Sequence, residues 1–384
     1  MKKTIIPYGK QFIDHNDISE VKKSLKERLI TTGKYVLKFE LKIKKKFKSK
    51  YALTCSNATA GLHLAFLSIN LKKGDVVIMP SINFISAYRM ADLIGAKIYL
   101  ADVDPITGQM TPETLINCIK KNKLIKIKAI ISMYLGGYIE NNLEFYKLKK
   151  KYKCNLIEDA CHAIGGKYSV NNKKYNVGSC KHSDLCVFSF HPVKTITTGE
   201  GGAITTNNKK YAERIKLLRN HGIEKKKKYW EYDIKELGYN YRLSDINCAL
   251  GLSQIKKLDF FYLKRKNIVE FYKQKFKAIN SIVTFSNSSN IYNCYHFFLL
   301  SINFKKINSS KDQFIKYLNS RGIIPQFHYV PIFKFNFYKK KNIKMYSGAI
   351  KYYKNTLSLP VYYDLNKQQQ LYIIKNVIKF LSKK

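Results

Sequence analysis

Acidic residues are scarce in this sequence of 384 residues. Its 26 Asp and Glu stand against 70 Lys and Arg, which gives a formal net charge of +44. An excess of this kind binds phosphate backbones, so a basic nucleic-acid-binding protein is one interpretation. The lysines, however, lie in short runs scattered along the chain, and such runs usually form solvated faces. We therefore expect no nucleic-acid partner, although the charge can steer small anionic substrates toward the protein.

Long apolar runs and paired cysteines are also lacking. The longest segment without charge, residues 278–304, is rich in Asn and Ser, and the apolar start of the chain stops at Pro7. These features argue against a membrane span and a signal peptide. The eight cysteines form no Cys-x-x-Cys pair, which disfavours both a disulfide framework and a zinc site. We expect a cytoplasmic protein with no membrane partner and no metal.

Apolar residues make up 45% of the chain, which favours a folded protein. Short apolar runs alternate with helical stretches such as residues 60–71. The predicted strands are residues 51–55, 76–79, 97–100, 129–133, 155–158, 185–190 and 203–205. Continuous apolar strands separated by helices predict an α/β fold with a mostly parallel sheet covered on both faces. Ligands bind such sheets at the carboxyl ends of the strands.

The sequence pattern changes near residue 255, where aromatic residues mix with lysines and the alternation of predicted strands and helices becomes less regular. We therefore predict a large domain over residues 14–254 and a smaller α+β domain over residues 255–384. Residues 1–13 can pack on either of them.

Two charged residues follow predicted strands. Asp159 comes after the strand at 155–158, and Lys194 comes after the strand at 185–190, before a glycine-rich turn. A lysine in that place can be partly desolvated, which lowers its pKa and suits it to Schiff-base chemistry with a carbonyl or with pyridoxal phosphate. The pyridine nitrogen of that cofactor prefers an anionic partner, and Asp159 is the candidate. A buried Asp–Lys ion pair is the alternative interpretation.

A third element is SNATAG (56–61), which joins a predicted strand to a predicted helix. Small residues at a helix N-terminus let backbone N–H groups approach an anion, and Thr59 and Ser56 can add hydroxyl groups. Ser189 supplies another hydroxyl group near Lys194. An ordinary helix cap would explain this motif alone. Together with Asp159 and Lys194 it indicates a phosphate site, a carboxylate and an amine.

Several segments, taken in order, resemble the DegT/DnrJ/StrS family of pyridoxal-phosphate sugar aminotransferases. They are EDACHAIG (158–165), FSFHPVK (188–194), TTGEGG (197–202), IPYG (6–9), TTGK (31–34), LGG (135–137), RNHG (219–222), GYNYR (238–242) and QFHY (326–329). The resemblance covers nearly the whole chain. It implies the aspartate-aminotransferase fold, which is fold type I of the pyridoxal-phosphate-dependent transferases.

The resemblance also implies roles for single residues. Lys194 matches the lysine that binds the cofactor covalently and moves the proton, Asp159 matches the partner of the pyridine nitrogen, and His162 lies next to the phenolic oxygen. Phe84 matches the aromatic residue that stacks on the ring. The phosphate contacts match Ala58, Thr59 and Ser189, with Asn240 reaching the cofactor of a neighbouring subunit in a homodimer with shared active sites.

Substrate contacts are implied at two further segments and one tyrosine. They match Tyr8, Ile30, Thr31, Thr32, Gly33, Gln326, Phe327, His328 and Tyr329. GSCKHSD (178–184) and LGYNYRLSD (237–245) resemble the pseudaminic-acid branch of the family. That branch implies transfer of an amino group from glutamate to carbon 4 of a UDP-linked 4-keto-6-deoxy-N-acetylhexosamine. Enzymes of the perosamine and bacillosamine types remain alternatives.

Other interpretations stay open for some residues. His191 can be a second base, although one lysine suffices and a positioning role is favoured. His63 is expected to be a packed helix residue. A non-enzymatic regulator or a lysine-free dehydratase of the same fold would lack part of this set, whereas Lys194 and the phosphate motif are both present.

Overall fold

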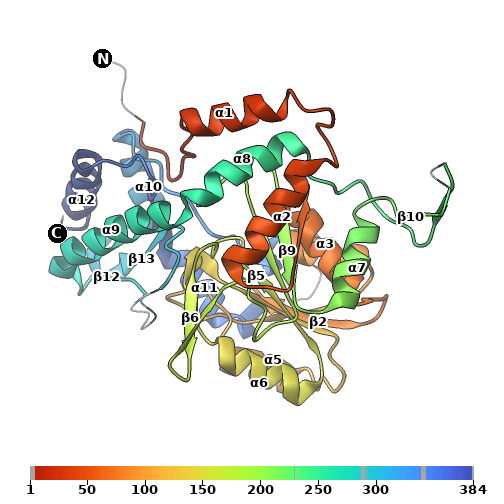
Figure 1. The fold of residues 1–384 in the computed structure, drawn as a ribbon. Coiled ribbons are helices and arrows are strands. Elements are labelled where there is room, and N and C mark those ends of the chain that lie inside the picture. Colours follow the sequence, from red (N-terminus) through yellow and green to blue (C-terminus); the bar gives the residue numbers. More distant parts are fainter. Residues whose placement is uncertain (1–4, 229, 287–289, 291, 339–342, 383–384) are drawn as a thin grey trace.

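The structure, a computed structural model, describes residues 5–228, 230–286, 290, 292–338 and 343–382. Its centre is a seven-stranded sheet with the strand order β1-β9-β8-β5-β4-β2-β3 (Figure 1). The strands are β1 (Tyr51–Cys55), β2 (Val76–Pro80), β3 (Lys97–Ala101), β4 (Ala129–Met133), β5 (Asn155–Asp159), β8 (Leu185–Ser189) and β9 (Gly202–Thr206). Each of them lies within one residue of a strand predicted from an apolar run.

The sheet is mostly parallel, as the sequence predicted. Strands β8, β5, β4, β2 and β3 pair in parallel, while β9 runs antiparallel to both β8 and β1. Every residue of β4, β8 and β9 is buried. Strands that are buried on both faces cannot alternate polar and apolar residues, which explains their continuous apolar sequences.

Helices cover both faces of the sheet. Leu156 and Ile157, which point to opposite faces of β5, belong to different clusters of the core. One face packs against α3 (Ala58–Ser68), α4 (Ser86–Leu93) and α7 (Lys209–Leu218). The other packs against α2 (Lys34–Phe47), α5 (Pro112–Lys121), α6 (Asn142–Tyr152) and α8 (Asp245–Lys256), and α1 (His15–Ser24) lies on α8.

A second, three-stranded antiparallel sheet lies in the C-terminal part of the chain. Its strands are β12 (Val283–Thr284), β13 (Phe298–Ile302) and β14 (Thr356–Leu359). The helices of this part are α9 (Leu258–Phe276), α10 (Lys311–Ser320), α11 (Ser347–Asn355) and α12 (Lys367–Leu381). Ile6 forms a bridge with Ile323, so the N-terminal segment contacts this part. The predicted division after residue 254 falls in the last turn of α8 and stays a prediction.

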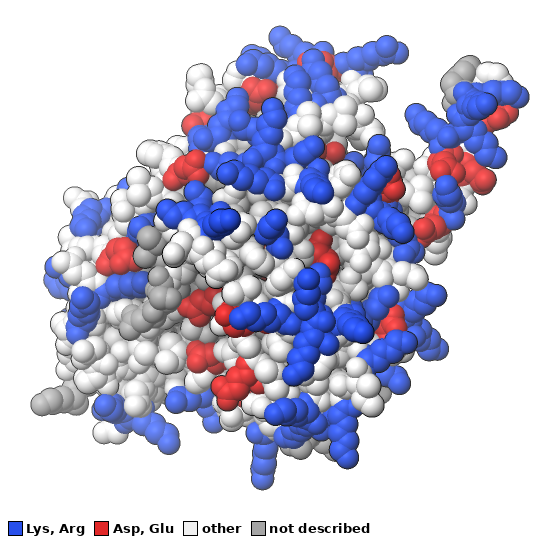
Figure 2. All heavy atoms as spheres, turned by 60° about the horizontal axis from the view of Figure 1, so that its bottom comes forward, with Lys and Arg blue, Asp and Glu red and all other residues white. Residues whose placement is uncertain are grey.

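Two short hairpins complete the fold. One consists of β6 (Lys167–Val170) and β7 (Lys173–Asn176), and the other of β10 (Ile223–Lys225) and β11 (Tyr232–Ile234). Figure 1 shows the β10–β11 hairpin projecting from the body of the molecule. Figure 2 shows Lys and Arg side chains spread widely over the displayed face, with fewer acidic side chains among them. In the described part of the chain, no helix combines the length and the apolar character that a bilayer crossing needs.

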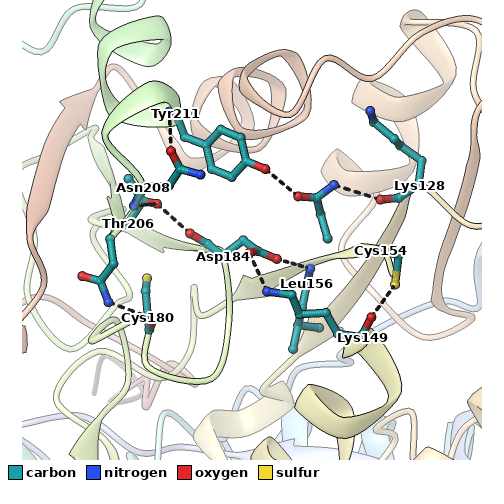
Figure 3. A network of polar contacts seen from close by, with 11 residues as sticks. Lys128, Lys149, Cys154, Leu156, Cys180, Asp184, Thr206, Asn208 and Tyr211 are labelled. Carbon is teal, nitrogen blue, oxygen red and sulfur yellow. Dashed lines mark hydrogen bonds and ion pairs between the residues drawn. The ribbon is translucent and has the colours of Figure 1, made fainter. Parts of the chain in front are cut away.

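A polar network joins the amino ends of β5 and β8 to the carboxyl end of β9 (Figure 3). The carboxylate of Asp184, just before β8, accepts from the Leu156 N–H at 2.8 Å and binds the Lys149 amine at 2.6 Å. The backbone oxygen of Asp184 accepts from the Thr206 hydroxyl at 2.7 Å. This one residue therefore links β5, β8, β9 and the last turn of α6.

We predict that Asp184→Ala lowers the free energy of unfolding by about 1–3 kcal/mol, because the Leu156 N–H loses its partner while it stays largely buried. Urea-induced unfolding measures the change. Glu213→Ala is the matched control, because Glu213 only forms an exposed pair with Lys209 at 3.7 Å. That variant should change the free energy by less than about 0.5 kcal/mol. Equal effects of the two substitutions would contradict the role given to Asp184.

Candidate active site

A cavity of about 890 Å³ opens at the carboxyl ends of the parallel strands. Its wall includes residues that directly follow β1, β5 and β8, as the rule for such sheets predicts. Segment 326–329 and His296, from the C-terminal part of the chain, close it from the other side. Polar groups from distant parts of the sequence therefore meet in one enclosed space.

Lys194 lies in this cavity, on the connection from β8 to β9. Its backbone N–H donates to the His191 carbonyl at 2.9 Å, and the connection is further closed by the Phe190 N–H, which donates to Gly201 at 2.8 Å. Burial of the amine lowers the pKa of Lys194, and the nearby Cys161 and Asp159 oppose this shift only in part. An amine with a lowered pKa is unprotonated more often at neutral pH, so it is a better nucleophile and base.

Asp159 is the last residue of β5 and is buried. The Cys161 N–H donates to its carboxylate at 3.3 Å, and Asp159 forms no ion pair in the described part of the chain. Burial raises the pKa of this carboxyl group. Hydrogen bonds from Cys161 and the charge of Lys194 counteract this rise in part. A cationic ring nitrogen placed beside the carboxyl group would favour its ionised form.

The start of α3 has a geometry that suits an anion. The Asn57 side chain caps the helix by accepting from the Ala60 N–H at 2.9 Å, and Ala58 and Thr59 line the cavity. The Thr59 hydroxyl lies 2.8 Å from that of Ser86. Gly202, the first residue of β9, packs against this turn so closely that a Cβ there would lie 2.8 Å from the Asn57 carbonyl carbon. The helix dipole and free N–H groups suit a phosphate.

Aromatic side chains form the remaining wall. His162 is buried, and its ring lies 4.4 Å from that of His296. Burial, with the charge of Lys194, holds the pKa of His162 well below its usual range. Phe84 is 53% exposed and its ring lies 5.6 Å from that of Tyr329. Phe84 can therefore cover a flat ring bound in the cavity.

These residues fit pyridoxal phosphate. The cavity holds an amine for the aldehyde, a buried carboxylate without a cationic partner for the ring nitrogen, and a helix start for the phosphate. Among the residues that the structure describes, no group of three or more His, Cys, Asp or Glu side chains gathers as a metal site would require. None of the eight cysteines forms a disulfide.

A model of the DegT/DnrJ/EryC1/StrS aminotransferase family matches residues 11–378. The chain belongs to this family. A Campylobacter jejuni family relative, a UDP-4-amino-4,6-dideoxy-N-acetyl-beta-L-altrosamine transaminase, is 37% identical over 381 residues, which are 99% of this chain and 98% of the relative. The same enzyme from another Campylobacter jejuni strain is 35% identical over 99% of this chain and 98% of its own length.

Solved structures agree with this family membership. Helicobacter pylori PseC, an aminotransferase of pseudaminic acid biosynthesis, superposes with a TM-score of 0.88 at 29% identity, over 99% of this chain and 100% of its own. A putative sugar aminotransferase from Streptococcus pneumoniae in its PLP form has a TM-score of 0.87 at 24% identity, over 99% of this chain and 98% of its own, which shows the fold alone. The aspartate-aminotransferase-like α/β fold expected from the sequence is confirmed.

Most of the site residues expected from the sequence line the cavity together. They are Tyr8, Ala58, Thr59, Phe84, Asp159, His162, Ser189, Lys194, Gln326, Phe327, His328 and Tyr329. His191 lines it too, and its side chain is exposed. His63 is buried on α3, where its Nδ1 lies 3.2 Å from the Tyr241 hydroxyl.

Five expected residues lie outside the cavity of their own chain. Residues 30–33 bind the start of α8, where Asp245 accepts from the Gly33 N–H at 2.6 Å and donates its own N–H to the Ile30 carbonyl at 2.9 Å. Asn240 is exposed and bridges to Asn220. The five residues outside the cavity are Ile30, Thr31, Thr32, Gly33 and Asn240. A single chain therefore does not place them beside Lys194.

Some lining residues were missed by the sequence analysis. Tyr241 lies in the GYNYR motif (238–242), next to Asn240, so this motif could have indicated it. Ser86 comes two residues after Phe84 and its hydroxyl reaches Thr59. His296 lies in the uncharged segment 278–304, which carries no motif, so no local signal pointed to it.

We predict that pyridoxal phosphate followed by borohydride reduction labels Lys194 before any other lysine at pH 8, because this amine has a lowered pKa and lies in the cavity that fits the cofactor. Peptide mass mapping measures the labelled site. Lys311 is an internal control, because its pKa is also lowered, to about 8, but it lies outside the cavity lining. Labelling of Lys311 ahead of Lys194 would overturn the assignment. So would a Lys194→Ala variant that takes up as much label in total as the unchanged protein.

Proposed function

We propose that this chain uses pyridoxal phosphate to transfer an amino group from glutamate to carbon 4 of a UDP-linked 4-keto-6-deoxy-N-acetylhexosamine, in pseudaminic acid biosynthesis. The observation that carries this proposal is that Asp159, which ends β5, and Lys194, which follows the adjacent strand β8, share one cavity with the start of α3, which suits a phosphate. The names of the Campylobacter and Helicobacter relatives support the substrate.

The cofactor, when bound, supplies an electron sink for the electron pair left on carbon when a proton is removed. Lys194 supplies the base: its amine takes the proton from the α-carbon of glutamate and, in the second half-reaction, delivers one to carbon 4 of the sugar. Such proton transfer by a placed group contributes about 10²–10⁴-fold to the rate. Asp159 holds the ring nitrogen in its protonated form. One amine that serves both half-reactions predicts ping-pong kinetics.

A donor–acceptor assay tests the substrate. We expect glutamate to aminate the UDP-linked 4-keto sugar of altrose configuration, with the product identified by its mass. We expect Lys194→Ala to keep the fold and lose at least about 10²-fold in turnover, because it lacks the base. Preference for a GDP- or dTDP-linked sugar, or for another UDP sugar, would replace this proposal by an aminotransferase of the perosamine or bacillosamine type.

We also propose a homodimer in which each chain completes the active site of its partner. Exposed apolar side chains gather on α1, on the loop after it and on α2, and monomers seldom expose so many in one region. They are Ile18, Leu25, Leu29, Ile30, Leu37 and Leu41. The exposed Asn240 and the segment 30–33, which stay outside their own cavity, are the residues that a partner would use.

Mixed dimers test this arrangement. Lys194→Ala and Asn240→Ala chains should each have little activity alone. The first lacks the base, and the second lacks the contact from Asn240 to the phosphate of the partner's cofactor. After unfolding and refolding together, each mixed dimer should regain one complete site, so the mixture should be more active than either variant. Turnover of refolded mixtures, with each variant refolded alone as the control, measures this. Activity that stays at the average of the two variants would exclude shared sites.

A further inference from the structure

Lys311 is the first residue of α10, a place where the helix does not stabilise it. A helix N-terminus carries a partial positive charge, so a lysine there gains nothing from the helix dipole. The helix does not need Lys311 as a cap either, because Ser310 and Gln313 form a capping box. Lys311 is nevertheless partly buried, and it forms no ion pair in the described part of the chain. Other contacts must therefore hold it in place.

The Lys311 amine contacts two aromatic rings. It lies 4.9 Å from the centre of the Phe327 ring and 4.9 Å from the centre of the Tyr353 ring. It also donates a hydrogen bond to the Tyr353 carbonyl at 2.6 Å. A cation within about 6 Å of a ring centre is attracted to the ring, and more strongly where water is excluded. The charge of Lys311 therefore attracts the ring of Phe327.

The backbone on either side of Phe327 is held by contacts of its own. Gln326 and Ser358 exchange two backbone hydrogen bonds, at 3.1 and 2.8 Å. The Tyr352 hydroxyl donates to the His328 carbonyl at 2.6 Å. These bonds fix the path of the chain, but they leave the torsion angles of the Phe327 side chain free. The Phe327 ring, which lines the cavity, is therefore oriented by its packing and by its contact with the amine.

The charge on Lys311 changes at mildly alkaline pH. Burial lowers the pKa of Lys311 to about 8, and the charge of Asp312 opposes this shift. The other titratable groups beside it are Tyr353 and Lys334, whose amine lies 5.7 Å from the centre of the Tyr353 ring. Below about pH 8 the Lys311 amine is charged and attracts both rings. At higher pH the neutral amine can still donate to the Tyr353 carbonyl, but it loses its attraction to the Phe327 ring.

We propose that Lys311 is a positioning residue, whose positive charge orients the Phe327 ring as a wall against which the sugar nucleotide binds. The inference rests on the proposed function, because it requires a sugar nucleotide in the cavity. Lys311 itself does not line the cavity, so it acts through Phe327. An aromatic wall offers an apolar face to a sugar or a base, whereas glutamate is short and mostly polar. The effect therefore falls on binding of the sugar nucleotide.

The KM of the sugar nucleotide tests this role. Lys311→Met keeps a long side chain but removes the charge. At pH 7 it should raise the KM of the sugar nucleotide by about 3–10-fold, as expected for the loss of a partly buried cation–π contact. Both kcat and the KM of glutamate should change by less than about twofold, because the contact serves binding alone. An unchanged KM of the sugar nucleotide, or an equal loss in kcat, would overturn the proposal.

The pH dependence separates the charge of Lys311 from its bulk. The ratio of KM in Lys311→Met to KM in the unchanged protein should fall from about 3–10 at pH 7 to about 1 at about pH 9.5, because the unchanged protein then loses the charge too. Lys194 and the other titratable groups of the cavity are present in both proteins, so their effects cancel in this ratio. A ratio that stays constant would overturn the role of the charge.

Lys311→Arg gives a second test, which does not need Lys311→Met to fold. A guanidinium group stays charged at alkaline pH, so this variant should keep a low KM for the sugar nucleotide at about pH 9.5. There its KM should be about 3–10-fold lower than that of the unchanged protein. Equal KM values of the two proteins at that pH would overturn the proposal.

Lys334→Met is the matched control. Lys334 is exposed, and its amine also lies over the Tyr353 ring, at 5.7 Å from the ring centre. This variant removes one positive charge from the same region without removing the cation beside Phe327. It should therefore change the KM of the sugar nucleotide by less than about twofold. An equal rise in KM in both variants would show a general effect of the lost charge on an anionic substrate and would overturn the proposal.

A double variant shows whether Lys311 acts through the ring. Phe327→Leu should raise the KM of the sugar nucleotide, because the aromatic wall is lost. Adding Lys311→Met to Phe327→Leu should raise this KM no further, because the charge then has no ring to orient. A further rise of the size seen with Lys311→Met alone would mean that Lys311 acts by another route, and it would overturn the inference.

The failure of the inference differs from the failure of the proposed function. An unchanged protein that aminates no sugar nucleotide overturns the proposed function, and the role of Lys311 with it. An unchanged protein that aminates its sugar nucleotide, together with a Lys311→Met variant that has the same KM at pH 7, overturns the role of Lys311 alone.

Discussion

The chemistry of this protein depends on a sheet that is buried on both of its faces. Within β4, β8 and β9 every residue is buried, so functional polar groups are concentrated where strands end. Asp159 ends β5, and Lys194 follows the end of β8. Their burial has a direct chemical effect, because it raises the pKa of the carboxyl group and lowers that of the amine. The same burial that stabilises the core thus shifts the pKa of both groups.

The strands were predictable because strands that are buried on both faces consist of consecutive apolar residues. The strand at 129–133 was predicted with the bounds that the structure shows. The direction of β9 was not predictable, since an apolar run of five residues looks the same in either direction. The helix predicted at 60–71 is observed at Ala58–Ser68, because the Asn57 side chain caps it two residues earlier. Helix ends depend on such single contacts.

Site residues were predictable where a polar residue lies at the end of a strand. They were not predictable where they depend on contacts between residues that are far apart in the sequence. Asp159 and Lys194 carry their own signal in the residues before them. The hydrogen bond between Gly136 and His162 joins positions 26 residues apart, and the one between His162 and Tyr329 joins positions 167 residues apart. Asn240 and residues 30–33 lie outside the cavity of their own chain, and their use by a second chain stays a proposal.

The reversed direction of β9 has a consequence for the loop that carries Lys194. A parallel neighbour after β8 would require a crossover of a dozen or more residues to the far edge of the sheet. Because β9 runs back, β8 ends and β9 begins at the same edge, and residues 190–201 never leave it. Hydrogen bonds from Thr197 and Thr198 to Phe190 and from Asn247 to Thr198 close this loop upon itself. Reversing one strand therefore keeps the whole connection, with Lys194 on it, at the edge of the sheet where the cavity lies.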